Sequence, residues 1–183
     1  PDKKKIDELR RETNKFSDEL RRLLDLNKIE AEVFVGGSFA KGTIVKQEEY
    51  EIDIFVRFDW KYSDLSDILE KSLKKLTKKM KLELKRVHGS RDYFKVVKEN
   101  TIFEVIPVVK IKRVREARNV TDLSYFHVLY LKRKLTKKMK KDLIIVKKFC
   151  KAQKVYGAES YINGFSGYGL ECLIIYYKTF GNM

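Results

Sequence analysis

The stretch "VFVGGSFAKGTIVKQEEYEIDIFVRF", from Val33 to Phe58, decides the fold because it joins two apolar runs through a glycine turn. The first run, residues 31–35, predicts a short strand that ends at the two glycines. We expect Ser38 to cap a short helix that continues to about Val45. The second run alternates between apolar and polar residues over positions 51–58, which predicts a half-buried strand.

This second strand carries two acids, Glu51 and Asp53, which are two residues apart and therefore point to the same face of a sheet. Adjacent carboxylates repel each other, and burying them without partners costs several kcal/mol. A divalent cation such as Mg²⁺ removes that cost, because hard cations take oxygen ligands and borrow others from phosphate groups. We interpret the pair as a metal site.

The glycine turn has the composition of a phosphate-binding loop. Gly37 allows the backbone to approach an anion closely, and the N–H groups at the start of the following helix attract it. Ser38 adds a hydroxyl group and Lys41 adds a positive charge. A metal site and a phosphate-binding loop about a dozen residues apart together indicate nucleotidyl transfer.

Glu104 is a third candidate carboxylate, and it lies within an apolar run three residues before Pro107. An acid at this position is either a surface residue of an edge strand or a metal ligand on a strand beside the first pair. Given the other two acids, we favour the ligand.

Helical and strand patterns alternate through the first two thirds of the chain. Apolar residues at helical spacing predict helices over residues 6–24 and 65–80, and further strands are expected at 82–87, 93–97 and 101–112. Beyond Arg118 the pattern becomes helical. The sequence therefore predicts an α+β domain over residues 1–118 and a helical domain over residues 119–183.

Composition indicates a folded protein with an anionic partner. Of the 183 residues, 43% are hydrophobic and 12% aromatic, and 41 Lys and Arg against 26 Asp and Glu give a net charge of +15. This excess favours nucleic acid, although a Lys-rich proteome or a high growth temperature produces a similar composition. Two Lys-rich stretches, 71–85 and 132–141, either follow an RNA backbone or are ordinary solvated helix faces. Each contains the heptapeptide "KLTKKMK", which we interpret as a chance repeat.

The two cysteines, Cys150 and Cys172, lie in apolar helical patterns and are expected to be buried thiols in a reducing compartment. No apolar run approaches the length of a membrane-spanning helix. We expect a cytoplasmic protein with no membrane partner.

Longer motifs carry a family resemblance. "GGSFAKGT" followed by "EIDIFV" is similar to the signature of the polymerase-β-type nucleotidyltransferases. With "FEVIPVVKIK", "LSYFHV", "LIIVKKFCKAQKVYGAE" and "GFSGYGLECLIIYYKTF", the chain resembles archaeal (class I) CCA-adding tRNA nucleotidyltransferases from about residue 5 to residue 180. The resemblance implies a polymerase-β-like head with a mixed sheet, followed by a helical neck domain.

The resemblance also implies site residues. The family's metal-binding acids match Glu51, Asp53 and Glu104. Its nucleotide-binding residues match Gly37, Ser38, Lys41, Ser124, His127, Lys147 and Tyr156. Taken alone, the histidine would be interpreted as a core or surface residue, the second lysine as part of a solvated helix face and the tyrosine as core.

The implied activity is template-independent addition of C and A to the 3′ end of tRNA from CTP and ATP, with two Mg²⁺ ions. Three departures bear on it: Glu104 replaces the usual Asp, Asn163 replaces a usual Arg, and the family chain continues beyond Met183 into body and tail domains. A second protein chain that supplies those domains, or a homo-oligomer, would suit the apolar final helix. The alternatives are a minimal nucleotidyltransferase acting on another RNA, a protein hydroxyl or small nucleotides, and a non-catalytic RNA-binding remnant.

Overall fold

The chain forms two compact units in a computed structural model that describes residues 1–158 and 162–183. Unit 1 consists of residues 1–37 and 46–125, and unit 2 of residues 38–45 and 126–183. The sequence places a domain boundary after residue 118. In the structure, the last segment of unit 1 ends at Tyr125 and unit 2 resumes at residue 126. The segment 38–45 also belongs to the helical unit, because its side chains are bonded to helices of that unit, as described below.

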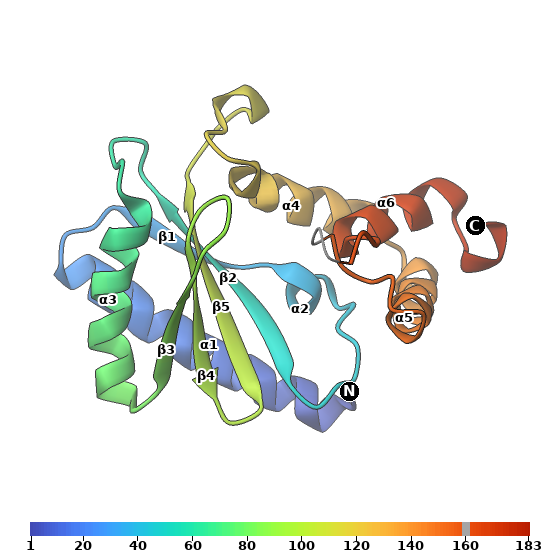
Figure 1. Cartoon of the computed structure of the whole chain (residues 1–183), viewed down its shortest axis with the longest axis horizontal. Coiled ribbons are helices and arrows are strands. Elements are labelled where there is room, and N and C mark those ends of the chain that lie inside the picture. The colour runs from blue at the N-terminus through green and yellow to red at the C-terminus, as the bar shows by residue number, and fades with distance from the viewer. Residues whose placement is uncertain (159–161) are drawn as a thin grey trace. The chain divides into compact units, whose positions relative to one another are not determined.

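Unit 1 is built on a five-stranded mixed sheet in the order β1-β2-β5-β4-β3 (Figure 1). The strands are β1 (Ala31–Val35), β2 (Tyr50–Phe58), β3 (Glu83–Val87), β4 (Tyr93–Lys98) and β5 (Thr101–Val109). The central pair, β2 and β5, is parallel, and the other three pairs are antiparallel. The predicted mixed sheet is therefore confirmed.

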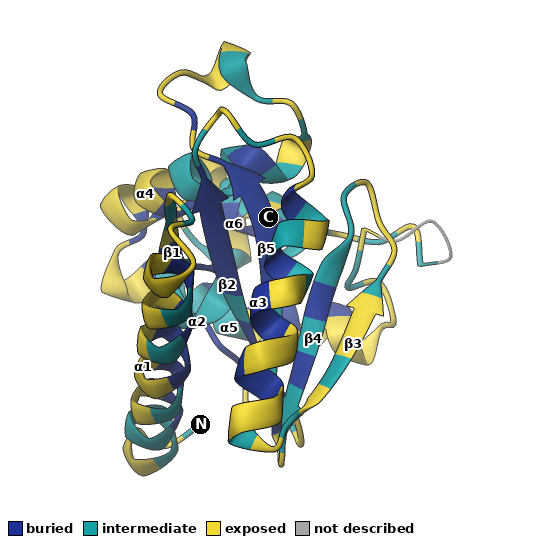
Figure 2. Cartoon of the chain, turned by 90° about the vertical axis from the view of Figure 1, so that its left-hand side faces the viewer, coloured by how far each residue is buried: buried dark blue, intermediate teal, exposed yellow. Residues whose placement is uncertain are grey.

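Two helices, α1 (Lys3–Leu26) and α3 (Leu65–Met80), cover one face of this sheet. Figure 2 shows that their exposed residues face away from the sheet and their buried residues face it. Phe16 of α1 stacks on Phe103 of β5 with 4.5 Å between ring centroids, and both side chains are fully buried. The alternating apolar residues of β2, such as Ile52 and Ile54, complete this core.

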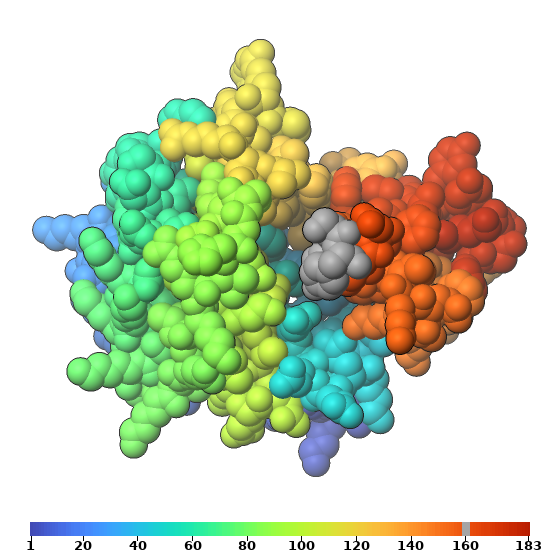
Figure 3. All heavy atoms as spheres, viewed as in Figure 1, coloured from blue at the N-terminus to red at the C-terminus, as the bar shows by residue number. Residues whose placement is uncertain are grey.

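The other face of the sheet has a small apolar cluster and carries the polar residues of β2, β4 and β5. Phe55, Ile106 and Val108 are buried there, with Phe34 and Tyr93 packed against them. In the space-filling view, the side chains of the strands hide most of α1 (Figure 3).

The predicted elements up to β5 are confirmed, with two corrections. The strand expected over residues 101–112 is β5, which ends at Val109. The helix expected to begin at Ser38 and to continue to about Val45 is α2 (Gly37–Lys41), so Ser38 lies within its first turn and does not cap it. The helix ends early because Gly42 has a φ of +69°, a left-handed conformation that stops the helical path. Two short 3₁₀ turns, η1 (Val114–Glu116) and η2 (Val120–Leu123), follow β5.

Unit 2 is helical, as the sequence predicts beyond residue 118. It contains most of α4 (Ser124–Lys134), then α5 (Lys137–Ala152), α6 (Gly167–Tyr177) and η3 (Phe180–Asn182). Its core is a cluster of Leu131, Leu135, Met139, Leu143, Val146, Cys150, Leu170 and Ile174. Both thiols are free, with Cys150 buried and Cys172 half-buried.

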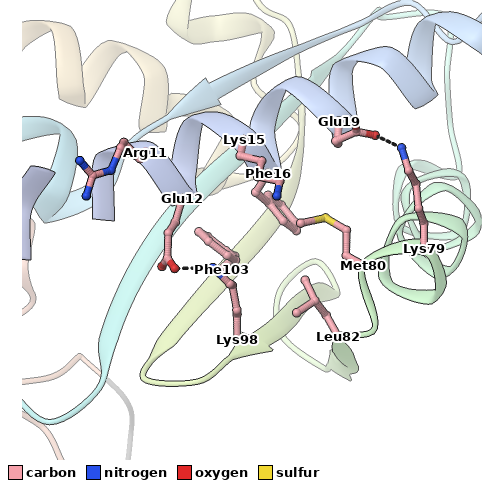
Figure 4. Close-up of a pocket in the computed structure, with 10 residues that line it drawn as sticks. All are labelled: Arg11, Glu12, Lys15, Phe16, Glu19, Lys79, Met80, Leu82, Lys98 and Phe103. Carbon is pink, nitrogen blue, oxygen red and sulfur yellow. Dashed lines mark hydrogen bonds and ion pairs between the residues drawn. The ribbon is translucent and has the colours of Figure 1, made fainter. Parts of the chain in front are cut away.

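A cavity of about 410 Å³ lies on the helix-covered face of the sheet in unit 1 (Figure 4). Its floor includes Phe16 and Phe103, and at its rim Glu12 pairs with Lys98 and Glu19 pairs with Lys79. None of the predicted site residues lines it. Among the described residues, no helix is both long enough and apolar enough to cross a membrane.

Candidate functional site

The three predicted carboxylates lie on neighbouring strands at the centre of the sheet. Asp53 of β2 is the register partner of Glu104 of β5, and Glu51 lies two residues before Asp53 on the same strand. Register partners on parallel strands point to the same face, so all three acids share the face that α1 and α3 leave uncovered. Because β5 lies between β2 and β4, Glu104 is not on an edge strand.

Lys95, which the sequence analysis does not single out, lies among these acids. It is the register partner of Glu104 on β4. Its Nζ is 2.9 Å from Glu104 Oε1 and 3.7 Å from Glu51 Oε1. Partial burial lowers the pKa of Lys95, but the hydrogen bond and charge of Glu104 and the charge of Glu51 outweigh it, so the net pKa is raised and the ammonium is retained.

The donor set suits Mg²⁺, because three carboxylates on one face supply the oxygen ligands that a hard cation takes. As the side chains stand, however, no group of three His, Cys, Asp or Glu within residues 1–158 and 162–183 is gathered closely enough to hold a metal ion. The Lys95 ammonium contacts two of the three acids and supplies the positive charge that a metal would otherwise bring. Metal binding at this face would require that ammonium to withdraw.

The glycine turn lies directly against Asp53. The backbone N–H of Gly36 donates to the carbonyl oxygen of Asp53 at 2.9 Å. Gly37 has a φ of +58°, and a Cβ atom there would lie 1.6 Å from Asp53 Oδ2. A side chain at this position would force the Asp53 carboxylate to move and would also be strained by the positive φ, which favours glycine.

In unit 2, the two predicted lysines converge on one buried acid. Lys41 Nζ donates to Glu171 Oε2 at 2.7 Å, and Lys147 Nζ donates to Glu171 Oε1 at 3.3 Å. Lys147 Nζ also donates to the hydroxyl of Thr43 at 3.2 Å. The exposed fractions of the Lys41, Lys147 and Glu171 side chains are 10%, 3% and 0%. The two lysine side chains and the one carboxylate therefore form a charged group in a site almost closed to water.

His127 of α4 is close to this group, because the charges of Lys41 and Glu171 both act on it. Burial and the Lys41 ammonium lower the pKa of His127 below its ordinary value, and the Glu171 carboxylate opposes them. The imidazole is therefore mainly neutral at pH 7. Its ring stacks on Tyr168 of α6 with 4.1 Å between centroids.

For the other predicted nucleotide-binding residues, Ser38, Ser124 and Tyr156, the structure gives no bond to Glu171 among the described residues. The carbonyl oxygen of Ser38 accepts a hydrogen bond of 2.9 Å from the Thr43 backbone N–H. Ser124 is the first residue of α4 and is half-buried. Tyr156 lies beneath Lys151, whose Nζ is 5.2 Å from the ring centroid. Glu159, the last residue of one quoted family motif, lies outside the described residues.

Sequence reasoning therefore missed Lys95, Glu171 and Tyr168. Glu171 has one signal in the sequence, because it is an acid within the otherwise apolar final helix "GLECLIIYY". Lys95 has no such signal, because a polar residue at its position is ordinary in a strand whose residues alternate between buried and exposed faces.

Comparisons with known sequences match two families. Residues 14–160 match the family described as "Nucleotidyltransferase domain", and residues 141–183 match "tRNA nucleotidyltransferase, second domain". The chain is 42% identical over 154 residues to the CCA-adding enzyme of Nanoarchaeum equitans, covering 83% of this chain and 37% of the relative. It is 35% identical over 179 residues to the CCA-adding enzyme of Sulfurisphaera tokodaii, covering 97% of this chain and 42% of the relative. The chain thus spans about two fifths of the length of these relatives.

Solved structures show the same fold at low identity. A Cid1 poly(U) polymerase structure matches with a TM-score of 0.71 at 19% identity, covering 96% of this chain and 50% of that chain. A cytoplasmic RNA terminal U-transferase matches with a TM-score of 0.68 at 18% identity, covering 96% of this chain and 47% of that chain. The predicted α+β nucleotidyltransferase fold and the resemblance to archaeal CCA-adding enzymes are confirmed, and the chain belongs to the nucleotidyltransferase family.

Proposed function

We propose that the chain transfers nucleoside monophosphates from CTP and ATP to the 3′-hydroxyl of tRNA, in the manner implied by its relatives' name, CCA-adding enzyme. The observation that carries the proposal is the register of β2 and β5, which sets Asp53 beside Glu104 on the face where Glu51 also lies. A carboxylate group beside a glycine turn suits metal-dependent chemistry on a phosphate.

In the proposed reaction, the oxygen of the 3′-hydroxyl forms a bond to the α-phosphorus of the nucleotide. The bond from that phosphorus to the bridging oxygen breaks, pyrophosphate leaves, and the hydroxyl proton is released. Glu51, Asp53 and Glu104 are the residues that would hold two Mg²⁺ ions. When bound, these ions activate the attacking oxygen and stabilise the charge on the departing pyrophosphate.

We assign triphosphate binding to the residues that the family resemblance implies: Gly37, Ser38, Lys41, Ser124, His127, Lys147 and Tyr156. Lys41 and Lys147 share one carboxylate, and their ammonium groups are the cations that we assign to the phosphate oxygens. His127, mainly neutral at pH 7, would donate one hydrogen bond without adding charge.

The proposal is tested by Asp53→Ala in an assay of Mg²⁺-dependent incorporation of labelled CTP and ATP into tRNA that lacks its CCA end. We expect incorporation to fall to background, since Asp53 is the acid closest to the glycine turn. Full activity in the variant would end the proposal. Incorporation that occurs with another RNA, a protein hydroxyl or a free nucleotide, but not with tRNA, would support one of the alternative acceptors. Binding without turnover would support the RNA-binding remnant.

A further inference from the structure

Seven cations lie within ten residues where α4 meets α5 in unit 2. The last turn of α4 and the first two turns of α5 carry them with no acid between: Lys132, Arg133, Lys134, Lys137, Lys138, Lys140 and Lys141. All are exposed except Lys140, which is half-buried. We call this group the basic corner. It supplies seven positive charges in a chain whose net charge is +15.

The basic corner is fixed by the core beneath it. Leu131, Leu135 and Met139, which alternate with the cations along the chain, are buried in the apolar cluster of unit 2. Thr136 also fixes the start of α5, because its hydroxyl accepts a hydrogen bond of 3.2 Å from the Met139 backbone N–H. The cations are therefore displayed on two anchored helix ends.

The described part of the chain offers these cations no acidic partner. Within residues 1–158 and 162–183, the structure gives no ion pair and no side-chain hydrogen bond to any of the seven. The next acid along the chain, Asp142, accepts a hydrogen bond of 3.2 Å from the backbone N–H of Phe180.

The other Lys-rich stretch, residues 71–85 in unit 1, also carries seven cations, but three of them are paired with acids. Lys74 pairs with Glu70 at 2.6 Å, Lys79 with Glu19 at 2.7 Å and Lys85 with Glu83 at 3.1 Å. Lys75 also donates to Asn27 at 2.9 Å. A polyanion would have to compete with those acids, whereas at the basic corner it would relieve repulsion between like charges and release bound counterions.

We propose that the basic corner binds the phosphate backbone of the RNA acceptor and that the acid-paired lysines of residues 71–85 do not. The identity of the polyanion as RNA rests on the proposed function. Seven cations within ten residues suit a chain of closely spaced negative charges, and an RNA strand is the partner of that kind which a nucleotidyltransferase acting on tRNA would hold.

The two Lys-rich stretches provide a matched test. Lys137→Gln, Lys138→Gln and Lys140→Gln together remove three cations of the basic corner. Lys74→Gln, Lys79→Gln and Lys85→Gln together remove the three lysines of residues 71–85 that pair with acids. Both triple variants lose three positive charges. Binding of a labelled RNA hairpin with a single-stranded 3′ end is measured by fluorescence anisotropy over a series of salt concentrations, without nucleotide or Mg²⁺.

We expect the variant at the basic corner to bind at least about tenfold more weakly and its salt slope to fall by about two to three, close to one for each phosphate that the removed lysines would have neutralised. The control variant should stay within about threefold of the wild type, with a smaller change of slope. Equal effects of the two variants would overturn the proposal, since only net charge would then matter. Tighter binding of the wild type to phosphatidylserine vesicles than to RNA would overturn it in favour of a lipid surface.

Failure of this inference is distinguishable from failure of the proposed function, because no turnover is measured. Wild-type protein that binds RNA through the basic corner but incorporates no nucleotide would contradict only the function. Protein that incorporates nucleotide while both triple variants bind RNA equally well would contradict only the inference.

Discussion

Gly37 and Asp53 are joined by a contact that leaves no space for a side chain, which makes Gly37→Ala a sensitive test at the residue scale. A Cβ atom there would lie 1.6 Å from Asp53 Oδ2, so the carboxylate must move. A shift of about 1 Å in a catalytic group can cost about a hundredfold in rate. We expect a loss of that order in steady-state incorporation of labelled nucleotide.

The matched control for this variant is Gly42→Ala. Gly42 also has a positive φ, of +69°, but the nearest atom to its added Cβ is Lys140 Nζ at 3.9 Å. Both variants carry the backbone penalty of about 1–2 kcal/mol, measurable by urea unfolding. Only Gly37→Ala should lose activity. If both variants lose the same amount of activity, backbone strain, and not the contact with Asp53, is the cause.

Lys95 contacts two of the three carboxylates that are proposed to hold the metal, which leads to a prediction about Lys95→Met. Lys95→Met removes the ammonium that lies beside Glu51 and Glu104 and so removes its attraction for these two carboxylates. We expect Mn²⁺ to bind about three- to tenfold more tightly and the metal-free protein to unfold at a lower temperature. The measurement is the dependence of the melting temperature on Mn²⁺ concentration.

Lys98→Met is the control for Lys95→Met. Lys98 lies on the same strand but pairs with Glu12 at the cavity of Figure 4, on the other face of the sheet. Its loss should change stability without changing Mn²⁺ affinity. If Lys95→Met binds Mn²⁺ no more tightly than Lys98→Met, the proposed metal site is not at these acids.

Glu171 holds two ammonium groups in place, so Glu171→Gln should weaken triphosphate binding even though it makes the site more positive. Without the carboxylate, Lys41 and Lys147 repel each other in a site almost closed to water. We expect the dissociation constant for inorganic tripolyphosphate, measured by calorimetry, to rise about tenfold. Glu12→Gln, which breaks an ion pair in unit 1, should leave it unchanged. If Glu171→Gln binds tripolyphosphate more tightly than the wild type, the carboxylate does not position the two lysines and acts only by reducing the positive charge of the site.

The sequence predicted some of these residues because their signals are local. An acid in an apolar strand pattern, as at Asp53 and Glu104, is visible without a structure. Glu171 bonds to Lys147, which is 24 residues away, and to Lys41, which is 130 residues away. Pairings of this kind depend on the folded arrangement, and no local pattern encodes them.

At the scale of elements, the heptapeptide "KLTKKMK" takes two structures in one chain. In α3 the Thr77 hydroxyl donates to the Leu73 carbonyl oxygen of its own helix at 2.9 Å. At the second copy, Thr136 lies outside the helices and caps α5. Local sequence therefore does not decide the structure here. The tertiary setting differs between the copies, because Leu76 is buried in unit 1 and Leu135 in unit 2.

This difference predicts unequal costs for the same substitution. Thr136→Ala removes a helix cap and should lower the free energy of unfolding by about 1 kcal/mol. Thr77→Ala should lower it by about half of that or less, since alanine is the better helix former and the hydroxyl only returns to its own helix. Urea unfolding of both variants provides the comparison. A larger cost for Thr77→Ala would contradict the assignment of Thr136 as the cap.

Most helices and strands could be predicted because their apolar periodicities are regular, as in α1 and β2. The end of α2 could not, because Gly42 stops the helix and the following residues, Thr43 to Val45, are buried without being helical. An apolar run reads the same whether it is a buried helix or a buried extended segment.

At the scale of the whole molecule, the division into units is the feature that sequence could predict least. Residues 38–45 are flanked by unit 1 along the chain but belong to unit 2, where Lys41 and Thr43 bond to residues of α5 and α6. A boundary drawn along the sequence assumes that each domain is one continuous segment. The bonds of Lys41 and Thr43 break that assumption.

The chain spans about two fifths of the length of its CCA-adding relatives, which leads to the last prediction. Binding energy from parts of an RNA far from the reacting end raises the rate only if protein surface meets those parts. The chain should incorporate CTP and ATP into tRNA more efficiently when the unmatched portion of the Nanoarchaeum equitans relative is added as a second polypeptide. We expect kcat/KM for tRNA to rise about tenfold or more, while KM for the nucleotide stays within about threefold. A short hairpin with the same 3′ end is the control acceptor and should gain little. An equal gain with both acceptors would mean that the added polypeptide acts on the catalytic unit instead of on the RNA.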